Sequence, residues 1–221
     1  MKKRKPTIKY YFSVEGETEQ WYLKWLENIV NSEEAADCRV SIKADVEKNP
    51  LKYVKRTSFV GNTVTTVWHL CDYESDEPIH VKQFYDTMDN MKKAEQTGKK
   101  IKYRFGYSNL TFDLWIILHK DDCMGSYTHR KQYIKPLNKA YGTHFENMDD
   151  FKHEDHFKQC LSQLTLDNVK QALERAEWIE ERNVAAKNKL IQYKGFHFYR
   201  ENPSLGINGA VGMILSDAGL L

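Results

Sequence analysis

The sequence lacks the residue spacings that mark several common enzyme and metal-binding classes. None of its cysteines lies two residues from another, which excludes a zinc-ribbon pattern. No Gly-x-x-x-x-Gly-Lys phosphate-binding loop is present. No Gly-x-Ser-x-Gly elbow occurs either, so a serine hydrolase is not expected. Internal repeats and low-complexity segments are also absent.

Long hydrophobic runs are missing as well. No uninterrupted apolar run approaches the roughly 18 residues of a membrane span. The opening stretch MKKRKPTIKYYFS has no apolar core of the kind found in signal peptides. We therefore expect a cytoplasmic protein without a membrane partner. In that reducing compartment we expect free thiols at Cys38, Cys71, Cys123 and Cys160.

The charge balance is nearly even, with a net charge of +2, and argues neither for nor against a nucleic-acid partner. The distribution is more informative, because the chain has a basic start, MKKRKP, and a second basic cluster at residues 99–104. The plain interpretation of both is a solvated surface. The alternative is contact with a nucleic-acid backbone through Lys99, Lys100, Lys102 and Arg104.

Strand patterns and helix patterns alternate through the first half. Apolar, β-branched and aromatic runs predict strands at 8–14, 38–46, 63–72 and 100–108. Between them, helices are predicted from Thr18, as the N-cap, from Pro50 to about Phe59, and over 80–96. Periodicity leaves 111–119 open between strand and helix; capping by Ser108 or Asn109 favours a helix. This order predicts an α/β fold with a mostly parallel sheet.

The second half is polar and helical in pattern, and a last helix is predicted from about Gly209. We expect an α/β core at 1–120 and a helical extension at 121–221 that packs on it as a single compact unit. The HEDH stretch at 153–156 invites a metal-site interpretation, but a solvated helix face is favoured because no third ligand lies nearby.

Acidic residues follow two of the predicted strands directly. Glu15 follows YYFSV, and Asp72 and Glu74 follow TVWHLC. Parallel strands end at a common edge, so these carboxylates should converge there, and Mg²⁺ would offset their repulsion. Asp72 and Glu74 would point to one side of a still-extended segment. For Glu17 and Glu19, stabilisation of the helix start is the alternative.

Four stretches together resemble blocks of the RloB family, found beside bacterial restriction loci and in anti-phage defence islands. They are VEGETEQWYLKWL, LCDYES, SNLTFDLWIILH and ENPSLGINGAVGMIL. The order strand-Glu-Gly-helix, then strand-acid-x-acid, also resembles the Toprim domain of topoisomerases, primases and certain nucleases. Three positions depart from these patterns: Glu74 replaces aspartate, Leu110 replaces proline, and Asp113 replaces glutamate.

The resemblance implies a Toprim-like (Rossmannoid) nuclease core that uses Mg²⁺ or Mn²⁺. Glu15 would be a general acid/base or a metal ligand, Asp72 and Glu74 would hold the metal, and Asp113 could complete the catalytic cluster. Supporting roles would fall to Glu19, Asn109 and His119. For His119, at the end of an apolar run, a structural role is the alternative.

Two functions of different kinds follow. The first is a metal-dependent nuclease that cleaves RNA, with transfer RNA as one target, or DNA, in anti-phage defence. The second is a non-catalytic module that binds nucleic acid or a protein encoded in the same locus. Phosphoryl or nucleotidyl transfer by the same metal site is a third, weaker alternative. Homo-oligomer formation stays open.

Overall fold

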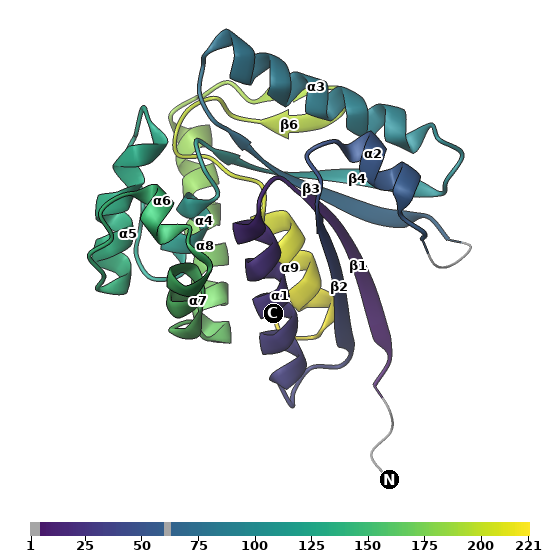
Figure 1. Cartoon of the computed structure of the whole chain (residues 1–221), viewed down its shortest axis with the longest axis horizontal. Coiled ribbons are helices and arrows are strands. Elements are labelled where there is room, and N and C mark those ends of the chain that lie inside the picture. Colours follow the sequence, from purple (N-terminus) through teal and green to yellow (C-terminus); the bar gives the residue numbers. More distant parts are fainter. Residues whose placement is uncertain (1–4, 60–62) are drawn as a thin grey trace.

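The computed structural model, which describes residues 5–59 and 63–221, contains a four-stranded parallel sheet flanked by helices (Figure 1). The strands are β1 (Thr7–Val14), β2 (Arg39–Val46), β3 (Thr65–Tyr73) and β4 (Ile101–Asn109), in the spatial order β2-β1-β3-β4. Each coincides with a predicted strand to within two residues. The predicted α/β fold with a parallel sheet and a helical second half is confirmed.

Strand pairing brings the carboxyl ends of the strands to one edge. Val14 at the end of β1 lies opposite Val46 of β2 and Leu70 of β3, and Tyr73 of β3 lies opposite Asn109 of β4. The residues that directly follow β1 and close β3 are therefore neighbours, although nearly 60 positions separate them in the sequence.

The two faces of the sheet are covered by different helices. One face carries Phe12, Val14 and Leu70 and packs against α1 (Glu17–Ser32), α4 (Asp113–Leu118) and α9 (Asn208–Asp217). The other face carries Tyr11, Val67 and Cys71 and packs against α2 (Pro50–Arg56) and α3 (Pro78–Glu95). Figure 1 shows α1 and α9 on one side of the sheet, with α2 and α3 on the other.

Several predicted helix ends require correction. α1 begins at Glu17 with Gly16 as its N-cap, so Thr18 is inside the helix, where its hydroxyl donates to Glu19 instead. α2 ends at Arg56 rather than near Phe59. The ambiguous segment 111–119 does contain a helix, α4, but Ser108 and Asn109 do not cap it because both belong to β4.

The turn from β4 into α4 is made by Leu110, whose φ of 68° lies in the left-handed region. Few residues other than glycine adopt this conformation. The Leu110 N–H donates to the carbonyl oxygen of Tyr73 at 2.8 Å, which ties the turn to the end of β3. The turn therefore sets where α4, and with it Asp113, begins at the sheet edge.

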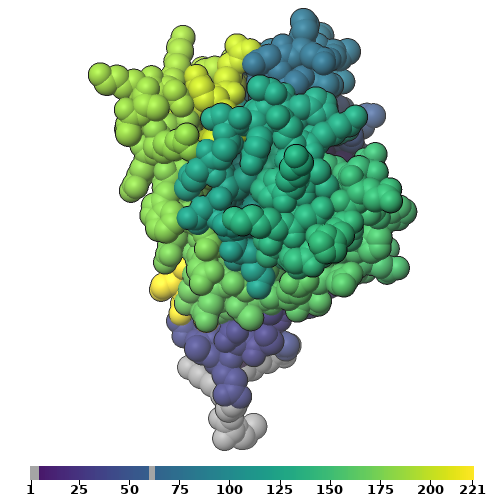
Figure 2. Space-filling model, turned by 90° about the vertical axis from the view of Figure 1, so that its left-hand side faces the viewer, coloured from purple at the N-terminus to yellow at the C-terminus, as the bar shows by residue number. Residues whose placement is uncertain are grey.

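The second half adds a helical layer, which forms much of the face seen in Figure 2. Its elements are η1 (Arg130–Tyr133), α5 (Ile134–Tyr141), α6 (Met148–Phe151), α7 (Glu154–Ser162) and α8 (Leu166–Ala185). The polar segment MDDFKHEDHFKQCLSQL does not form one helix, because it is interrupted between α6 and α7 at residues 152 and 153. Lys120 and Arg175 are among the side chains that tie these helices together.

A short hairpin was not predicted. It consists of β5 (Ile191–Tyr193) and β6 (Phe196–Phe198), joined by Lys194 and Gly195, both with positive φ. Such a turn suits a two-residue hairpin loop. β6 contributes Phe196 and Phe198 to the α3 face of the sheet.

All four cysteines are free and buried. Within the described residues, no helix has the length and apolar character needed to cross a membrane.

Candidate functional site

Glu15 and Asp72 meet at the carboxyl edge of the sheet. Glu15 is the first residue after β1, and its Oε2 accepts a hydrogen bond from the backbone N–H of Asp72 at 3.1 Å. Both side chains are half-buried. Burial raises the pKa of Glu15 to about 7, although the Asp72 N–H and the nearby Lys48 act in the opposite direction. A carboxyl with this pKa is able to take up or release a proton near neutral pH.

Further carboxylates crowd Asp72 on the face of the sheet that packs against α1 and α4. Burial, followed by the charge of Glu19, raises the pKa of Asp72 well above its ordinary value, and Glu15 and Asp113 add to the effect. Glu19 is only 4% exposed, and its pKa is raised chiefly by burial. Its Oε2 accepts a hydrogen bond from Thr18 at 3.0 Å. Glu19 thus lies inside the acidic site rather than at a solvated helix start.

Asp113 is the most enclosed of these acids, at 1% exposure. Its Oδ2 accepts from the Thr111 hydroxyl at 2.7 Å and lies 3.4 Å from Nζ of Lys152. Its Oδ1 is buried and has no hydrogen-bond partner among the residues that the structure describes. Such an orphaned oxygen is available to a ligand or a metal-bound water.

Lys152 is a functional candidate that the sequence patterns did not reveal. It lies in the break between α6 and α7, far from the strand ends in the sequence. The charge of Asp113 raises the pKa of Lys152, and Asp72 and Glu19 raise it further. A helical pattern with a lysine among acids predicts a solvated face, so only the tertiary packing places this cation at the site.

Glu74 lies at the carboxyl edge of the sheet on the side that faces α3. β3 ends at Tyr73, so the strand alternation that was expected to align Glu74 with Asp72 no longer applies. Oε2 of Glu74 lies 3.3 Å from Nε2 of His80 on α3. With Glu15, Cys71, Asp72 and His80, it lines a small cavity of about 30 Å³. The three predicted metal ligands therefore border one cavity.

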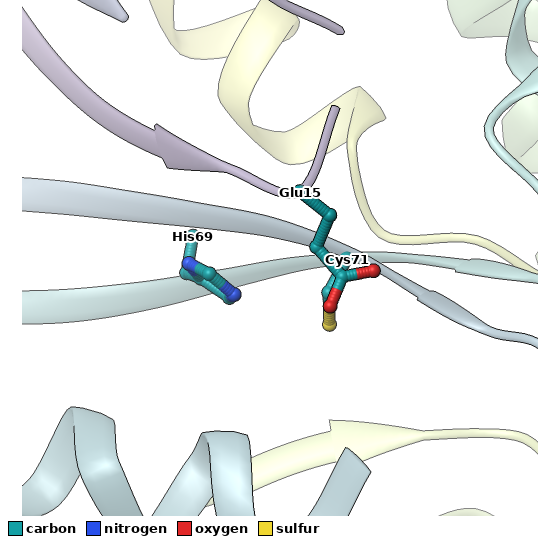
Figure 3. Close-up of side chains that lie close together, drawn as sticks. All are labelled: Glu15, His69 and Cys71. Atoms are coloured by element: carbon teal, nitrogen blue, oxygen red, sulfur yellow. The ribbon is translucent and has the colours of Figure 1, made fainter. Parts of the chain in front are cut away.

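The closest grouping of metal-ligand atoms includes two residues that were not predicted. Within residues 5–59 and 63–221, one group of three acidic, histidine or cysteine side chains has its ligand atoms within 4.8 Å of one another: Glu15, His69 and Cys71 (Figure 3). Burial lowers the pKa of His69 to about 3 and raises that of Cys71 well above its ordinary value. The sequence did contain a signal for these two ligands. In the strand WHLCD, which leads into the site, His69 and Cys71 are alternate residues and therefore share a face. The HEDH histidines are not in this group.

Asn109 and His119 are both engaged by the protein. The amide of Asn109 donates to the carbonyl oxygen of Arg200 at 2.7 Å, which holds the loop before α9. The ring nitrogens of the fully buried His119 lie 2.8 Å from the carbonyl oxygen of Trp115 and 3.2 Å from the hydroxyl of Tyr22. These contacts favour the structural alternative for His119.

The basic cluster lies at the amino end of β4, the opposite end of the strand from the acids. Lys99 donates to carbonyl oxygens at the end of α2, those of Val54 at 2.6 Å and Thr57 at 2.8 Å. Lys100 and Lys102 are exposed, and the guanidinium of Arg104, also exposed, lies 5.8 Å from the centre of a Trp68 ring. The structure therefore separates these predicted nucleic-acid contacts from the acidic site.

The acidic donor set fits a hard divalent cation. The side chains of Glu15, Glu19, Asp72 and Asp113 offer only oxygen atoms. One of these atoms, Asp113 Oδ1, is buried and has no partner in the described part of the chain. Mg²⁺ and Mn²⁺ favour carboxylate oxygens. A cation would also offset the mutual repulsion that raises the pKa of Asp72.

A parallel α/β fold with buried acids at the carboxyl edge of its sheet defines the general class of this protein. The chain belongs to the RloB-like family, whose model matches residues 10–208. No curated protein and no solved structure matches the chain.

Proposed function

We propose that this protein is a metal-dependent nuclease with a Toprim-like core. The observation that carries the proposal is the hydrogen bond from the Asp72 N–H to Glu15, which joins two strand ends beside the buried Glu19 and Asp113. Several buried carboxylates that share a single lysine, Lys152, are costly, and such acids concentrate at functional sites. Membership of the RloB-like family supports the same assignment.

Mg²⁺ or Mn²⁺ would be held by Glu15 and Asp72, with Glu74 across the cavity as a third ligand and Asp113 completing the cluster. When bound, the cation would stabilise charge on the phosphate and activate a water molecule. The protein supplies the proton chemistry. Glu15, with a pKa of about 7, would accept a proton from the attacking water or return one to the leaving oxygen.

Lys152 would be the positive side chain of the reaction site. It is partly exposed, at 31%, while its partner Asp113 is buried, so its ammonium group faces both the acids and solvent. In this position it would contact a non-bridging phosphate oxygen and lower the repulsion between substrate and carboxylates. Lys48, whose charge acts on Glu15, would assist from the loop that follows β2.

The substrate class we propose is RNA, with transfer RNA as one target, or DNA, in anti-phage defence. Phosphate contacts through Lys100, Lys102 and Arg104 at the amino end of β4 would require a polymer that extends beyond the cleavage site. A protein encoded in the same locus would deliver or restrain the nuclease.

The test is cleavage of mixed RNA and DNA with millimolar Mg²⁺ or Mn²⁺. Wild-type protein should cleave, and Glu15→Ala and Asp72→Asn should lose at least a hundredfold in rate while retaining the native circular dichroism spectrum. Glu17→Gln is the matched control, since Glu17 is exposed and only two residues away. Undiminished cleavage by both site variants would disprove the assignment. Nucleic-acid binding without cleavage in any protein would instead support the non-catalytic module.

A further inference from the structure

We propose that Glu15, His69 and Cys71 form a second cation site, specific for a borderline transition metal of the Zn²⁺ type. The three side chains come from neighbouring strands and lie on the side of the sheet that faces α3 (Figure 3). Their ligand atoms lie within 4.8 Å of one another. The site differs from the acidic one in its chemistry, because it offers a nitrogen, a sulfur and an oxygen.

His69 is the residue that points to a ligand. It is fully buried, and its Nδ1 lies 2.7 Å from the hydroxyl of Ser13. Its Nε2 is buried and has no hydrogen-bond partner among the described residues. With the Ser13 hydroxyl accepting from Nδ1–H, the lone pair of Nε2 is free to bind a metal. A second hydrogen bond of this kind commonly orients metal-binding histidines.

The backbone holds the three ligands in a fixed relation. Ser13 and His69 are paired in the register of β1 and β3, and Cys71 follows two residues later on the same face. Zinc bonds of 2.0–2.3 Å place ligand atoms roughly 3.5 Å apart, so binding would draw the three side chains together by about 1 Å. Rotation about side-chain bonds can supply this movement without a change in the sheet.

An ion has a route to two of the three ligands, Glu15 and Cys71, whereas His69 does not line the cavity that provides it. The cavity of about 30 Å³ is lined by Glu15 and Cys71, and also by Glu74 and His80, which are partly exposed. That volume is enough to hold a water molecule. The route therefore passes between the end of β3 and the start of α3.

The donor set decides which metal binds. On binding, the Cys71 thiol would release its proton to solvent. The resulting thiolate and the imidazole select Zn²⁺ and similar cations, while Mg²⁺ keeps to oxygen ligands and water. Three protein ligands leave a fourth position open in a tetrahedral site. One consequence rests on the proposed function. If Glu15 also serves the nuclease, Zn²⁺ and Mg²⁺ compete for its carboxylate, and Zn²⁺ therefore inhibits Mg²⁺-dependent cleavage.

Binding is tested on the purified, metal-stripped protein without nucleic acid. Co²⁺ is titrated as a spectroscopic substitute, and the near-ultraviolet absorption of a thiolate–cobalt bond is followed. Zn²⁺ affinity is measured by competition with a chelating dye. Wild type should bind one equivalent of each ion and show the thiolate band.

Cys71→Ser should abolish the band and weaken Zn²⁺ binding at least tenfold, and Glu15→Gln should weaken Zn²⁺ binding but keep the band. Cys123→Ser is the matched control, because Cys123 is as buried as Cys71, at 3% exposure, and lies elsewhere. Cys71→Ala, checked by circular dichroism, replaces Cys71→Ser if serine disturbs the fold. No thiolate band in wild type, or an unchanged band without Cys71, would overturn the proposal whether or not the protein cleaves nucleic acid.

Discussion

Glu15 and Asp72 are joined by a 3.1 Å hydrogen bond between the carboxylate of the first and the backbone N–H of the second. The donor is the main chain, so Glu15 is positioned by the sheet and not by the side chain of Asp72. Asp72→Asn should therefore leave Glu15 in place, and loss of cleavage in that variant would report on the Asp72 carboxylate itself.

Glu15→Gln should stabilise the metal-free protein at neutral and higher pH. The pKa of Glu15 is raised in the folded state to about 7, so its contribution to stability is complete below about pH 4.5 and is lost as the pH rises through 7. An uncharged glutamine avoids this loss, which amounts to about 3.5 kcal/mol for a rise from 4.5 to about 7, at roughly 1.4 kcal/mol per pKa unit.

Urea unfolding of wild type and Glu15→Gln at pH 5 and pH 8 measures the effect. The free energy of unfolding of wild type should fall more steeply between the two pH values than that of the variant. Glu17→Gln, at an exposed position, should follow wild type. Equal slopes for wild type and Glu15→Gln would contradict the burial of this charge.

Lys152→Met should destabilise the protein by about 2 kcal/mol, because it leaves the buried Asp113 charge without its cation. The partial exposure of Lys152 keeps the figure below that of a fully buried pair. Millimolar Mn²⁺ should restore part of the loss by supplying another positive charge.

Thermal or urea unfolding with and without Mn²⁺ reports the Lys152→Met effect. Lys158→Met on the neighbouring helix is the control: its ion pair with Glu154 is exposed on both sides, and its removal should change stability by less than about 0.5 kcal/mol. A Lys152→Met protein as stable as this control would show that Lys152 does not neutralise the acids.

Within the basic cluster, Lys99 and Lys102 should behave differently. Lys99→Met removes a donor from three carbonyl groups at the end of α2 and should cost about 1–2 kcal/mol. Lys102 is exposed, and its Nζ lies 3.7 Å from Oε1 of Glu95. Lys102→Met should therefore change the free energy of unfolding by less than about 0.5 kcal/mol.

Nucleic-acid affinity across a range of salt concentrations completes this comparison. If Lys102 contacts a phosphate, Lys102→Met should weaken binding and reduce the slope of log affinity against log salt by about 1. An unchanged slope would move the nucleic-acid surface away from the amino end of β4, towards Lys48 and Lys152.

The acids at the strand ends were predictable from the strand pattern, and Glu19 and Asp113 were named from the family resemblance, but Lys152, His69 and Cys71 were not predicted. A strand pattern followed by an acid is local information, and the parallel-sheet rule converts two such patterns into the Glu15–Asp72 pair. The position of Lys152 depends on a helix break and on the packing of α7 against α1, which no periodicity encodes. His69 and Cys71 were visible as alternate residues before Asp72, but a strand pattern alone does not separate a ligand from a core residue.

For the basic cluster, the sequence predicted the charge but not its position relative to the acidic site. A run of positive residues predicts a charged surface, but the strand direction places residues 99–104 at the far end of β4 from the acids. In addition, the ammonium group of Lys99 is occupied by its hydrogen bonds to α2. Charge content is a property of the sequence, whereas the partner of each charge is decided by the fold.

Leu110→Pro should be strongly destabilising, even though proline is the residue expected here from the family resemblance. The proline ring fixes φ near −65°, while Leu110 has a φ of 68° and donates its N–H to Tyr73 at 2.8 Å. Leu110→Ala keeps the N–H and loses only the buried side chain, so the difference between the two variants isolates the backbone. Proline should lower the free energy of unfolding by about 3 kcal/mol more than alanine in urea titrations. Equal losses would mean that the turn before Asp113 readily adopts another conformation, and that the position of Asp113 at the sheet edge does not depend on it.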